Sequence, residues 1–476
     1  MSKKIISILL GVLLLGTMAL AGCSTADEPD NGPKDAAEAG KDEAAPTDKP
    51  AEDTGSSERV KITYTIWGTA DEGTNVQAVA DQFNSSQDKI EVEVMAIPWE
   101  NYTTRLNTMA AANQLPDTGM LNENMVIPYS SNDMLLDSGS MYEGASQPID
   151  TVAFQYEGKT VAYSSANEIL ILYYNKDMFD AAGVAYPPAD VAHAWTWEEF
   201  VDAAKKLTLD SNGKHPGEDG FNSNSITQYG CMVENLTWQL EVWALSNGGG
   251  FYNSDGSEVA IDKPESIEAI QRIADLYLVD HVAPLSTGLT DDGVPRSIIT
   301  GTVAMTTNGT WNVGTSLGTA RNEGLNYGVA VLPYMKDKVT INTGGVNAVF
   351  SQTEHPKEAM EWIKWYSGIE HNWDNLIATG IWMPIFQEYY TDETYTHKWV
   401  DNPNFPDYDQ YKSAVVDYAI SDAAQKTAWY YTNNTVDFNT LLQSVLGDVW
   451  TGAKTAKDAI TENIDALRAA HAGEDK

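Results

Sequence analysis

Cysteine and metal-ligating motifs are the scarcest features of this sequence. Its 476 residues include two Cys, Cys23 and Cys231, and seven His. Because Cys23 follows an apolar leader, no disulfide is expected within the folded part and no Cys-based metal site can be built there. The His residues show no HExxH motif and no paired spacing. The sequence therefore predicts neither a bound metal nor any other cofactor.

Basic residues are also few. Lys and Arg number 29 against 68 Asp and Glu, which gives a formal net charge of −39. Loss of Lys3 and Lys4 with the leader would take this charge from −39 to −41. Nucleic acids and anionic membrane surfaces are bound through clustered Lys and Arg, so this balance argues against both as partners. A neutral solute remains possible.

The N-terminus carries the one long apolar run. Lys3 and Lys4 precede the apolar residues 5–20, and residues 20–23 read Leu-Ala-Gly-Cys. This order is typical of a bacterial export signal, and the run is too short for a membrane span. The last four residues have the form of a lipobox. We therefore expect removal of residues 1–22 and acylation of Cys23 with fatty acids that include palmitate. The alternative is an ordinary signal peptide with a chance Cys.

Aromatic residues are absent from residues 24–59, which are rich in Asp, Glu, Ala and Pro. Such a segment cannot bury enough apolar surface to offset the entropy of ordering. Residues 23–59 are therefore predicted to be a lipidated, disordered acidic linker. The roughly 415 residues that follow exceed what one core usually organises, which predicts two lobes.

The remaining chain is rich in aromatic residues, with 14 Trp and 23 Tyr. Several Trp stand beside Gly, Asn or Thr, among them Trp67, Trp311 and Trp382. A cleft lined in this way suits sugars, whose rings present flat C–H faces and hydroxyl edges. For each Trp taken alone, a position in the core or at its rim is the alternative.

Hydrophobic periodicity predicts an α/β fold with mixed, mostly parallel sheets flanked by helices. Residues 60–66 and 90–96 alternate as strands, and helices are expected over 75–83 and 102–112. In parallel sheets, ligands bind beyond the carboxyl ends of the strands, which places Trp67 at the mouth of a site.

Other segments carry equally clear signals. Residues 169–174 read as a strand buried on both faces, and Thr196 with Glu199 forms a capping box that opens a helix over 197–207. A strand over 302–305 is expected to end before a loop at 308–311. The C-terminal third is predicted to be mainly helical.

The order of landmarks resembles a known family. After the lipobox and the strand that ends in Trp-Gly come Leu-Pro-Asp (115–117), Leu-Tyr-Tyr-Asn-Lys-Asp-Met-Phe (172–179), Thr-Trp-Glu-Glu-Phe (196–200), Gly-Thr-Val-Ala-Met-Thr-Thr-Asn-Gly-Thr-Trp (301–311), Val-Leu-Pro (331–333), Gly-Gly-Val-Asn-Ala (344–348) and Pro-Lys-Glu-Ala (356–359). Residues 60–476 thus resemble the extracellular solute-binding proteins of family 1, the maltose-binding-protein-like receptors of ABC importers.

The resemblance implies a two-lobed, periplasmic-binding-protein-like fold with a hinge between the lobes. Lobe 1 would comprise residues 60–166 and 344–380, and lobe 2 residues 167–343 and 381–476. It further implies a monomeric, non-enzymatic receptor on the extracellular face of the cytoplasmic membrane. The expected partners are a neutral carbohydrate, the subunits of an ABC permease and, through the lipid anchor only, the membrane.

The resemblance also implies the site. Glu168 would accept hydrogen bonds from sugar hydroxyls, and Trp311 and Trp429 would stack on sugar rings. Met120 and Leu121 stand where the family often has an aromatic residue, and Trp67 could substitute for it. A solvated strand start or a salt bridge is the alternative role for Glu168. The full expected set is Trp67, Asp71, Asn122, Glu123, Glu168, Trp238, Asn308, Trp311, Gly344, Gly345, Trp382 and Trp429.

Several segments of the sequence are compatible with other functions. Residues 210–219 hint at a calcium loop, but Phe221 stands where an EF-hand needs Glu, which favours a polar turn. Residues 314–318 read Gly-Thr-Ser-Leu-Gly, as in a serine hydrolase elbow with Asp374 and His397 as partners, but the expected strand ends too early, near Met305. A lipid-anchored carbohydrate-active hydrolase with paired carboxylates, a receptor for a non-sugar solute and a surface sensor or adhesin remain alternatives.

Overall fold

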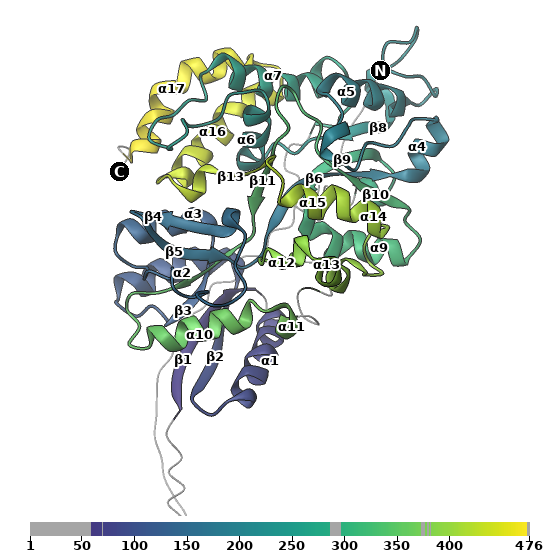
Figure 1. The fold of residues 1–476 in the computed structure, drawn as a ribbon. Coiled ribbons are helices and arrows are strands. Elements are labelled where there is room, and N and C mark those ends of the chain that lie inside the picture. Colours follow the sequence, from purple (N-terminus) through teal and green to yellow (C-terminus); the bar gives the residue numbers. More distant parts are fainter. Residues whose placement is uncertain are drawn as a thin grey trace, which may run out of the picture. The chain divides into compact units, whose positions relative to one another are not determined.

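Two β-sheets organise the protein in a computed structural model, which describes residues 59–68, 70–285, 297–372, 377, 380 and 382–473 (Figure 1). The first sheet has the strand order β2-β1-β3-β12-β5-β4, and the second has the order β13-β11-β6-β9-β8-β7, with β10 pairing β6. Ser57–Lys476 is one compact unit. The predicted signal peptide, Cys23 and the predicted linker, apart from Arg59, lie outside the described residues.

The first sheet forms the core of lobe 1. Its strands are β1 (Val60–Trp67), β2 (Ile90–Ile97), β3 (Thr118–Leu121), β4 (Ala153–Tyr156), β5 (Lys159–Ser164) and β12 (Val346–Val349). Helices α1 (Ala70–Ser86), α2 (Trp99–Ala111), α3 (Glu123–Ser131) and α10 (Pro356–Tyr366) pack on it (Figure 1).

The second sheet forms the core of lobe 2. Its strands are β6 (Glu168–Asn175), β7 (Leu209–Asp210), β8 (Ile226–Met232), β9 (Val303–Gly309), β10 (Tyr327–Ala330), β11 (Thr340–Thr343) and β13 (Ala424–Lys426). The longer helices of this lobe are α4 (Lys176–Ala182), α5 (Trp197–Leu207), α6 (Thr237–Ser246), α7 (Pro264–Leu278), α16 (Thr435–Trp450) and α17 (Ala456–Ala472).

Short helices complete the described part of the chain. The α-helical ones are α9 (Gly318–Asn322), α11 (Ile369–Asn372), α12 (Glu388–Thr391), α13 (Glu393–Val400), α14 (Tyr408–Tyr411) and α15 (Asp417–Ala419). Single 3-10 or π-helical turns cover Asp150–Val152, Val191–His193, Ser223–Ser225, Thr310–Asn312, Val313–Leu317, Lys412–Val416 and Ala428–Tyr430. None of the described helices is both long and apolar enough to cross a membrane.

The predicted two-lobed α/β fold with mixed sheets is confirmed, but its strand directions differ from the expectation. Parallel pairing joins β1 to β2 and β3, β8 to β9, and β11 to β13, whereas the other described pairs are antiparallel. Antiparallel pairs arise where β4 and β5 form a hairpin, and where β12 enters the first sheet against its neighbours. The sheets are therefore mixed without being mostly parallel.

Local sequence signals explain several elements. Thr196 accepts a hydrogen bond from the backbone N–H of Glu199, whose carboxylate accepts from the backbone N–H of Thr196, so the predicted capping box opens α5 as expected. Every residue of β6 is buried, as its continuous apolar run indicated.

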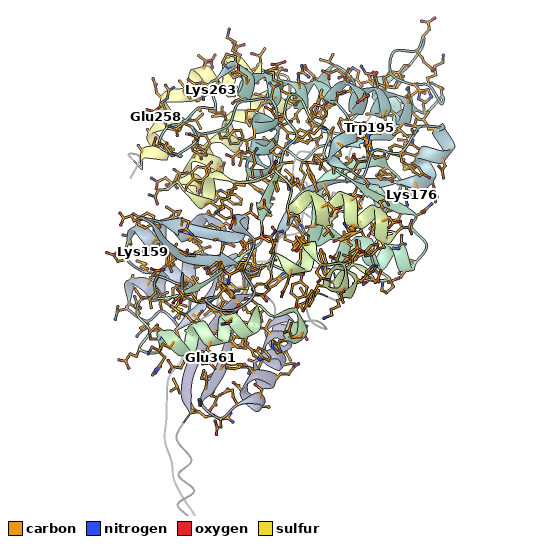
Figure 2. All side chains as sticks on the ribbon, in the orientation of Figure 1. Lys159, Lys176, Trp195, Glu258, Lys263 and Glu361 are labelled. Carbon is orange, nitrogen blue, oxygen red and sulfur yellow. The ribbon has the colours of Figure 1, made fainter. Side chains whose placement is uncertain are left out.

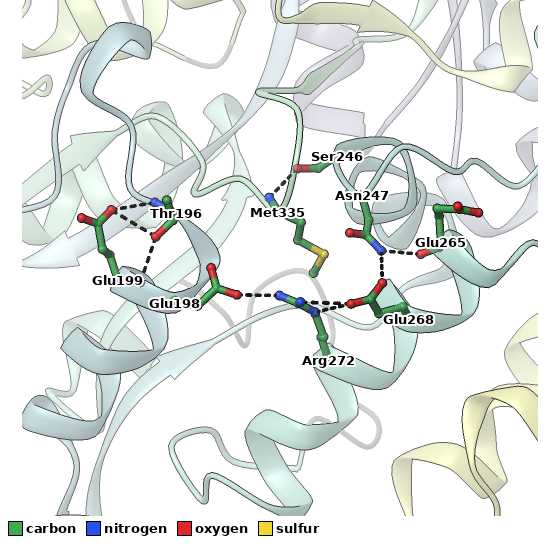
Figure 3. A network of polar contacts seen from close by, with 9 residues as sticks. All are labelled: Thr196, Glu198, Glu199, Ser246, Asn247, Glu265, Glu268, Arg272 and Met335. Atoms are coloured by element: carbon green, nitrogen blue, oxygen red, sulfur yellow. Dashed lines mark hydrogen bonds and ion pairs between the residues drawn. The ribbon is translucent and has the colours of Figure 1, made fainter.

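A polar network fixes the helices of lobe 2 relative to one another (Figure 3). Arg272 on α7 bonds Glu198 on α5 at 2.9 Å and Glu268 on its own helix at 3.0 Å. Asn247 follows α6, and its side-chain amide donates to the Glu265 carbonyl at 2.7 Å and to the Glu268 carboxylate at 3.1 Å. The C-terminal end of α6 is thus bonded to α7, while its N-terminal end reaches the cavity described below.

Three segments connect the lobes. Residues 165–167 lead from β5 to β6, residues 344–345 lead from β11 to β12, and a third segment passes through Met383. They are bonded together, since Ser165 donates its backbone N–H to the Gly345 carbonyl at 2.8 Å and Asn167 donates its backbone N–H to the Met383 carbonyl at 3.2 Å. The residue limits assigned to the two lobes stay a prediction.

Candidate functional site

A cavity of about 530 Å³ lies between the two lobes. It is lined by all but two of the predicted ligand contacts, namely Trp67, Asn122, Glu123, Glu168, Trp238, Trp311, Gly344, Gly345, Trp382 and Trp429. The two lobes and the segments between them all contribute to its wall. Figure 2 draws the described side chains on the ribbon, with exposed Lys159, Lys263, Glu258 and Glu361 at the periphery of the molecule.

Tryptophan dominates this wall. On the lobe 2 side, Trp238 lies between two other indoles. Its ring centroid is 6.2 Å from that of Trp311 and 5.6 Å from that of Trp429. On the lobe 1 side, Trp67 meets Trp99 edge to face at 5.5 Å. Trp382 is the sixth indole that lines the cavity. Such a surface can stack on several flat, apolar faces of one ligand.

Glycines make room for two of these indoles. A Cβ atom added at Gly309 would lie 1.8 Å from the Trp311 ring, so this ring lies directly on the Gly309 backbone. Gly345 has φ +37°, and a Cβ there would lie 2.7 Å from Trp67. Any larger residue at either position would displace the neighbouring indole.

Among the described residues, two carboxylates reach the cavity, and both are bonded to segments that connect the lobes. Glu123 accepts from the Thr343 hydroxyl at 2.5 Å and from the Gly344 backbone N–H at 2.8 Å. Glu168 accepts from the Thr310 hydroxyl and from the backbone N–H of Met383, the latter at 3.1 Å. Burial raises the pKa of Glu168 to about 7, although these two donors lower it in part.

No Lys, Arg or His is among the lining residues of the cavity that the structure describes. Its polar groups are the two carboxylates and neutral amides and hydroxyls, including Asn122, Asn124, Asn439 and Thr440. The site can therefore stack flat apolar faces and form hydrogen bonds with neutral groups. Its described lining offers no cationic side chain to neutralise a phosphate or a carboxylate of a ligand.

Two predicted contacts are placed differently. Asn308 is fully buried in β9, where its side-chain oxygen Oδ1 accepts from the Gly309 backbone N–H at 2.6 Å, and it does not line the cavity. The strand was expected to end near Met305, but pairing with β6 continues to Gly309 and takes Asn308 into the sheet. Asp71 falls within α1, although the sequence predicted that helix to begin at residue 75, and its side chain lies outside the described part.

The cavity also includes residues that the sequence reasoning missed. Trp99 follows β2 directly, and β2 runs parallel to β1, so the rule that selected Trp67 at a strand end would also have selected Trp99. No comparable signal marks Asn439 and Thr440 on α16. The other missed lining residues are Met120, Asn124, Ser165, Ala166, Thr237, Thr343 and Val436.

The serine hydrolase alternative finds no support in the described residues. Ser316 lies in the π-helical turn Val313–Leu317, which follows a 3-10 turn and not a strand. His397 is bonded to Asp401 at 2.8 Å and stacks on Tyr408. Asp374 lies outside the described part of the chain.

The loop suspected of calcium binding is held by backbone groups. The Asp210 carboxylate accepts from the backbone N–H groups of Asn212, Lys214 and Asn222, and Lys214 leads among the donors that lower its pKa. The Lys214 ammonium group donates to the Asp219 carbonyl at 2.5 Å. Within the described ranges, no group of three or more His, Cys, Asp or Glu side chains could hold a metal ion.

Curated relatives match part of the chain. The sn-glycerol-3-phosphate-binding periplasmic protein UgpB of Brucella abortus is 28% identical over 286 residues, which cover 56% of this chain and 60% of the relative. The maltotriose-binding protein of Pyrococcus abyssi is 23% identical over 252 residues, which cover 52% of this chain and 48% of the relative. The match thus spans less than two thirds of the length of either relative.

Solved structures match the fold over most of the chain. The ABC substrate-binding protein Lmo0181 of Listeria monocytogenes, solved in complex with cycloalternan, has a TM-score of 0.67 at 22% identity, over 86% of this chain and 98% of that one. The GacH receptor of Streptomyces glaucescens, solved unliganded and with acarbose, has a TM-score of 0.67 at 19% identity, over 87% and 99%. The family model described as bacterial extracellular solute-binding protein matches residues 78–407, well over half of the chain. The chain therefore belongs to the bacterial extracellular solute-binding protein family.

Proposed function

We propose that this protein is a receptor that binds a neutral oligosaccharide between its lobes and delivers it to an ABC permease. The observation that carries the proposal is the wall of six indoles with no basic side chain among its described residues. Successive indoles at 5.6 and 6.2 Å favour a ligand with several rings over a single small one. The relatives named for maltotriose, cycloalternan and acarbose support the same ligand class.

A phosphorylated solute fits the cavity less well. The Brucella relative is named for sn-glycerol 3-phosphate, whose doubly negative group is usually bound by Arg, Lys or a helix N-terminus. Here the charged lining groups are Glu123 and Glu168. The N-terminal ends of α3 and α6 also reach the cavity, but Glu123 stands in the first turn of α3 and would repel an anion there. We therefore infer that glycerol phosphate is not the ligand.

The receptor would release its ligand chemically unchanged. Both carboxylates at the cavity already accept hydrogen bonds from the protein, Glu123 from Gly344 and Glu168 from Met383. This supports a binding role for them over the acid and base roles that a glycosidase requires.

Anchoring is proposed from the sequence alone. The lipobox that ends at Cys23 and the acidic linker after it would hold a monomeric receptor at the extracellular face of the cytoplasmic membrane. The linker would leave the receptor free to meet its permease.

Titration calorimetry of the full chain against a ligand panel tests the ligand class. The panel pairs neutral oligosaccharides, maltotriose among them, with sn-glycerol 3-phosphate and a cationic peptide. We expect at least one neutral oligosaccharide to bind about tenfold more tightly than glycerol phosphate, with the recovered sugar unaltered by chromatography. Tight binding confined to the phosphate or the peptide would overturn the carbohydrate proposal, and hydrolysed sugar would overturn the receptor proposal.

A further inference from the structure

One short segment is bonded to both lobes and also carries a cavity indole. We call residues 424–432 the clasp; they comprise β13, the turn Ala428–Tyr430 and the two residues after it. The sequence-based division placed this whole segment in lobe 2. In the structure, neighbouring residues of the clasp pack against different lobes.

The contact with lobe 1 is aromatic and buried. The Tyr430 ring is 3% exposed and stacks on Phe154 of β4, with centroids 3.9 Å apart and planes 12° apart. It lies in the apolar cluster of lobe 1, and its hydroxyl is 3.3 Å from that of Ser164. Lys426 adds a bond from its ammonium group to the Ala153 carbonyl at 2.8 Å.

The contact with lobe 2 is equally definite. Strand β13 pairs with β11, and Ala428 is buried in the lobe 2 cluster. The Thr432 hydroxyl donates to the Gly256 carbonyl at 2.7 Å. Buried Glu241 on α6 accepts from the backbone N–H of Ala428, which ties the turn to the helix that carries Trp238.

Trp429 stands between these two anchors, beside Trp238. Because Trp429 and Tyr430 are consecutive, their Cα atoms are about 3.8 Å apart. Separation of the lobes by more than a few ångströms cannot preserve both the Tyr430–Phe154 stack and the Trp429–Trp238 contact. The complete row of indoles therefore exists only when Tyr430 is docked on lobe 1.

We propose that Tyr430 is a positioning residue: its docking on Phe154 completes the indole row through Trp429 and so couples ligand stacking to closure of the lobes. This inference rests on the proposed function for the identity of the ligand, but the coupling itself does not depend on that identity. A ligand that stacks on Trp429 would bind the joined arrangement more tightly than the separated one, which is the differential affinity that closure requires.

The test measures the distance between the lobes with and without a neutral oligosaccharide. Spin labels are placed by Glu361→Cys on lobe 1 and Lys263→Cys on lobe 2, both exposed positions (Figure 2), in a full-length chain with Cys23→Ser and a buried Cys231. In Tyr430→Leu we expect longer distances in pulsed electron paramagnetic resonance and about tenfold weaker binding, because the competent population falls. Tyr430→Phe, which keeps the stacked ring, should have distances and an affinity close to those of the wild type.

Further variants separate the loss of the clasp contacts from a general loss of fold stability. Tyr277→Leu removes another buried Tyr, within lobe 2 and bonded to Val233, and should leave the distances unchanged. If Tyr430→Leu fails to fold, Lys426→Met removes the neighbouring bond to lobe 1 and should lengthen the distances in the same direction.

The outcomes distinguish this inference from the proposed function. Wild-type distances and wild-type affinity in a folded Tyr430→Leu or Lys426→Met variant would overturn the proposed role of the clasp. If no oligosaccharide binds the wild type, the carbohydrate proposal fails. The distances between the spin labels in the unliganded variants still show whether the clasp holds the lobes together.

Discussion

At the scale of single residues, the cavity depends on side chains that are half-buried in an otherwise tightly packed protein. Trp311 packs against the lobe 2 core with one face and lines the cavity with the other. A half-buried indole of this kind offers apolar area to a ligand without sacrificing the core beneath it.

Replacement of Trp311 by Ala should therefore weaken binding far more than folding. The lost stacking area corresponds to about 2–4 kcal/mol of binding free energy, or roughly thirtyfold to a thousandfold in Kd. Calorimetry gives the affinity and thermal unfolding gives the stability. Trp365→Ala, at a half-buried indole on α10 outside the cavity, is the matched control and should bind normally. Unchanged affinity with a sharply lower Tm in Trp311→Ala would place Trp311 in the core instead.

Glu168 should make the stability of the protein depend on pH. Burial raises its pKa to about 7 in the folded chain, above the value of about 4.3 for an unperturbed Glu. Between these values the folded chain holds a proton that the unfolded chain has lost. The contribution to stability is thus present at low pH and disappears as the pH rises through about 7.

Glu168→Gln should accordingly reduce the fall in unfolding free energy between about pH 5 and pH 8 by roughly 1–3 kcal/mol. Urea unfolding at both pH values measures the change, with exposed Glu361→Gln as the control that keeps the wild-type slope. An equally steep fall in Glu168→Gln would show that this carboxyl is ionised in the folded protein across the whole range.

Many of the residues that line the cavity were among the ligand contacts predicted from the sequence. Trp67 was identifiable because it ends a strand with clear alternation, whereas Glu168 was expected through the resemblance to the family, since its place before an apolar run equally suits an ordinary strand start. Tyr430 was not identifiable, since a buried Tyr and a cleft Tyr have the same local sequence and only Phe154, far along the chain, distinguishes them. Asn439 and Thr440 on α16 resemble any exposed helical positions.

At the scale of elements, the end of β9 determines the geometry of the site. The strand continues to Gly309 and passes into the turn Thr310–Asn312, which returns the Trp311 ring onto the Gly309 backbone. The sequence suggested a shorter strand because polar Thr306, Thr307 and Asn308 look like loop residues. In the structure they are buried because β6 and β9 pair along this length.

Gly309→Ala should disrupt the site through this turn. The added methyl group would lie 1.8 Å from the Trp311 ring, so the indole must move off the strand end. We expect at least tenfold weaker binding, measured by calorimetry. Gly447→Ala on α16 is the control, because a Cβ there meets nothing within 4 Å and Ala favours the helix. Normal affinity in Gly309→Ala would mean that the indole can shift without loss of its contact with the ligand.

At the scale of the whole molecule, the folded unit and its predicted anchor are separable. Ser57–Lys476 forms one compact unit, and the lipobox lies well before it. A two-lobed fold was predictable from chain length and the order of landmarks. The bonding of the clasp to both lobes was not, because it depends on contacts between segments that are remote in sequence.

A chain that begins at Ser57 should be monomeric by light scattering and should bind its ligand as tightly as the full chain. In cells, Cys23→Ala should move the protein from the membrane fraction to the medium or leave it unprocessed, as judged by immunoblotting. Ser24→Ala, next to the predicted cleavage site, is the matched control and should remain in the membrane fraction. Retention of Cys23→Ala at the membrane would remove the lipid-anchor hypothesis.

The row formed by Trp311, Trp238 and Trp429 has an optical consequence. Indoles whose centroids lie 6.2 and 5.6 Å apart, with planes tilted by 34° and 40°, have near-ultraviolet transitions that couple to one another. We expect this coupling to contribute to a circular dichroism band of the protein, together with other close Trp pairs such as Trp362 with Trp365 and Trp197 with Trp243. A ligand inserted against the row, or a movement of the clasp that carries Trp429 away, would change that band without any label, so the molecule contains its own spectroscopic probe of occupancy.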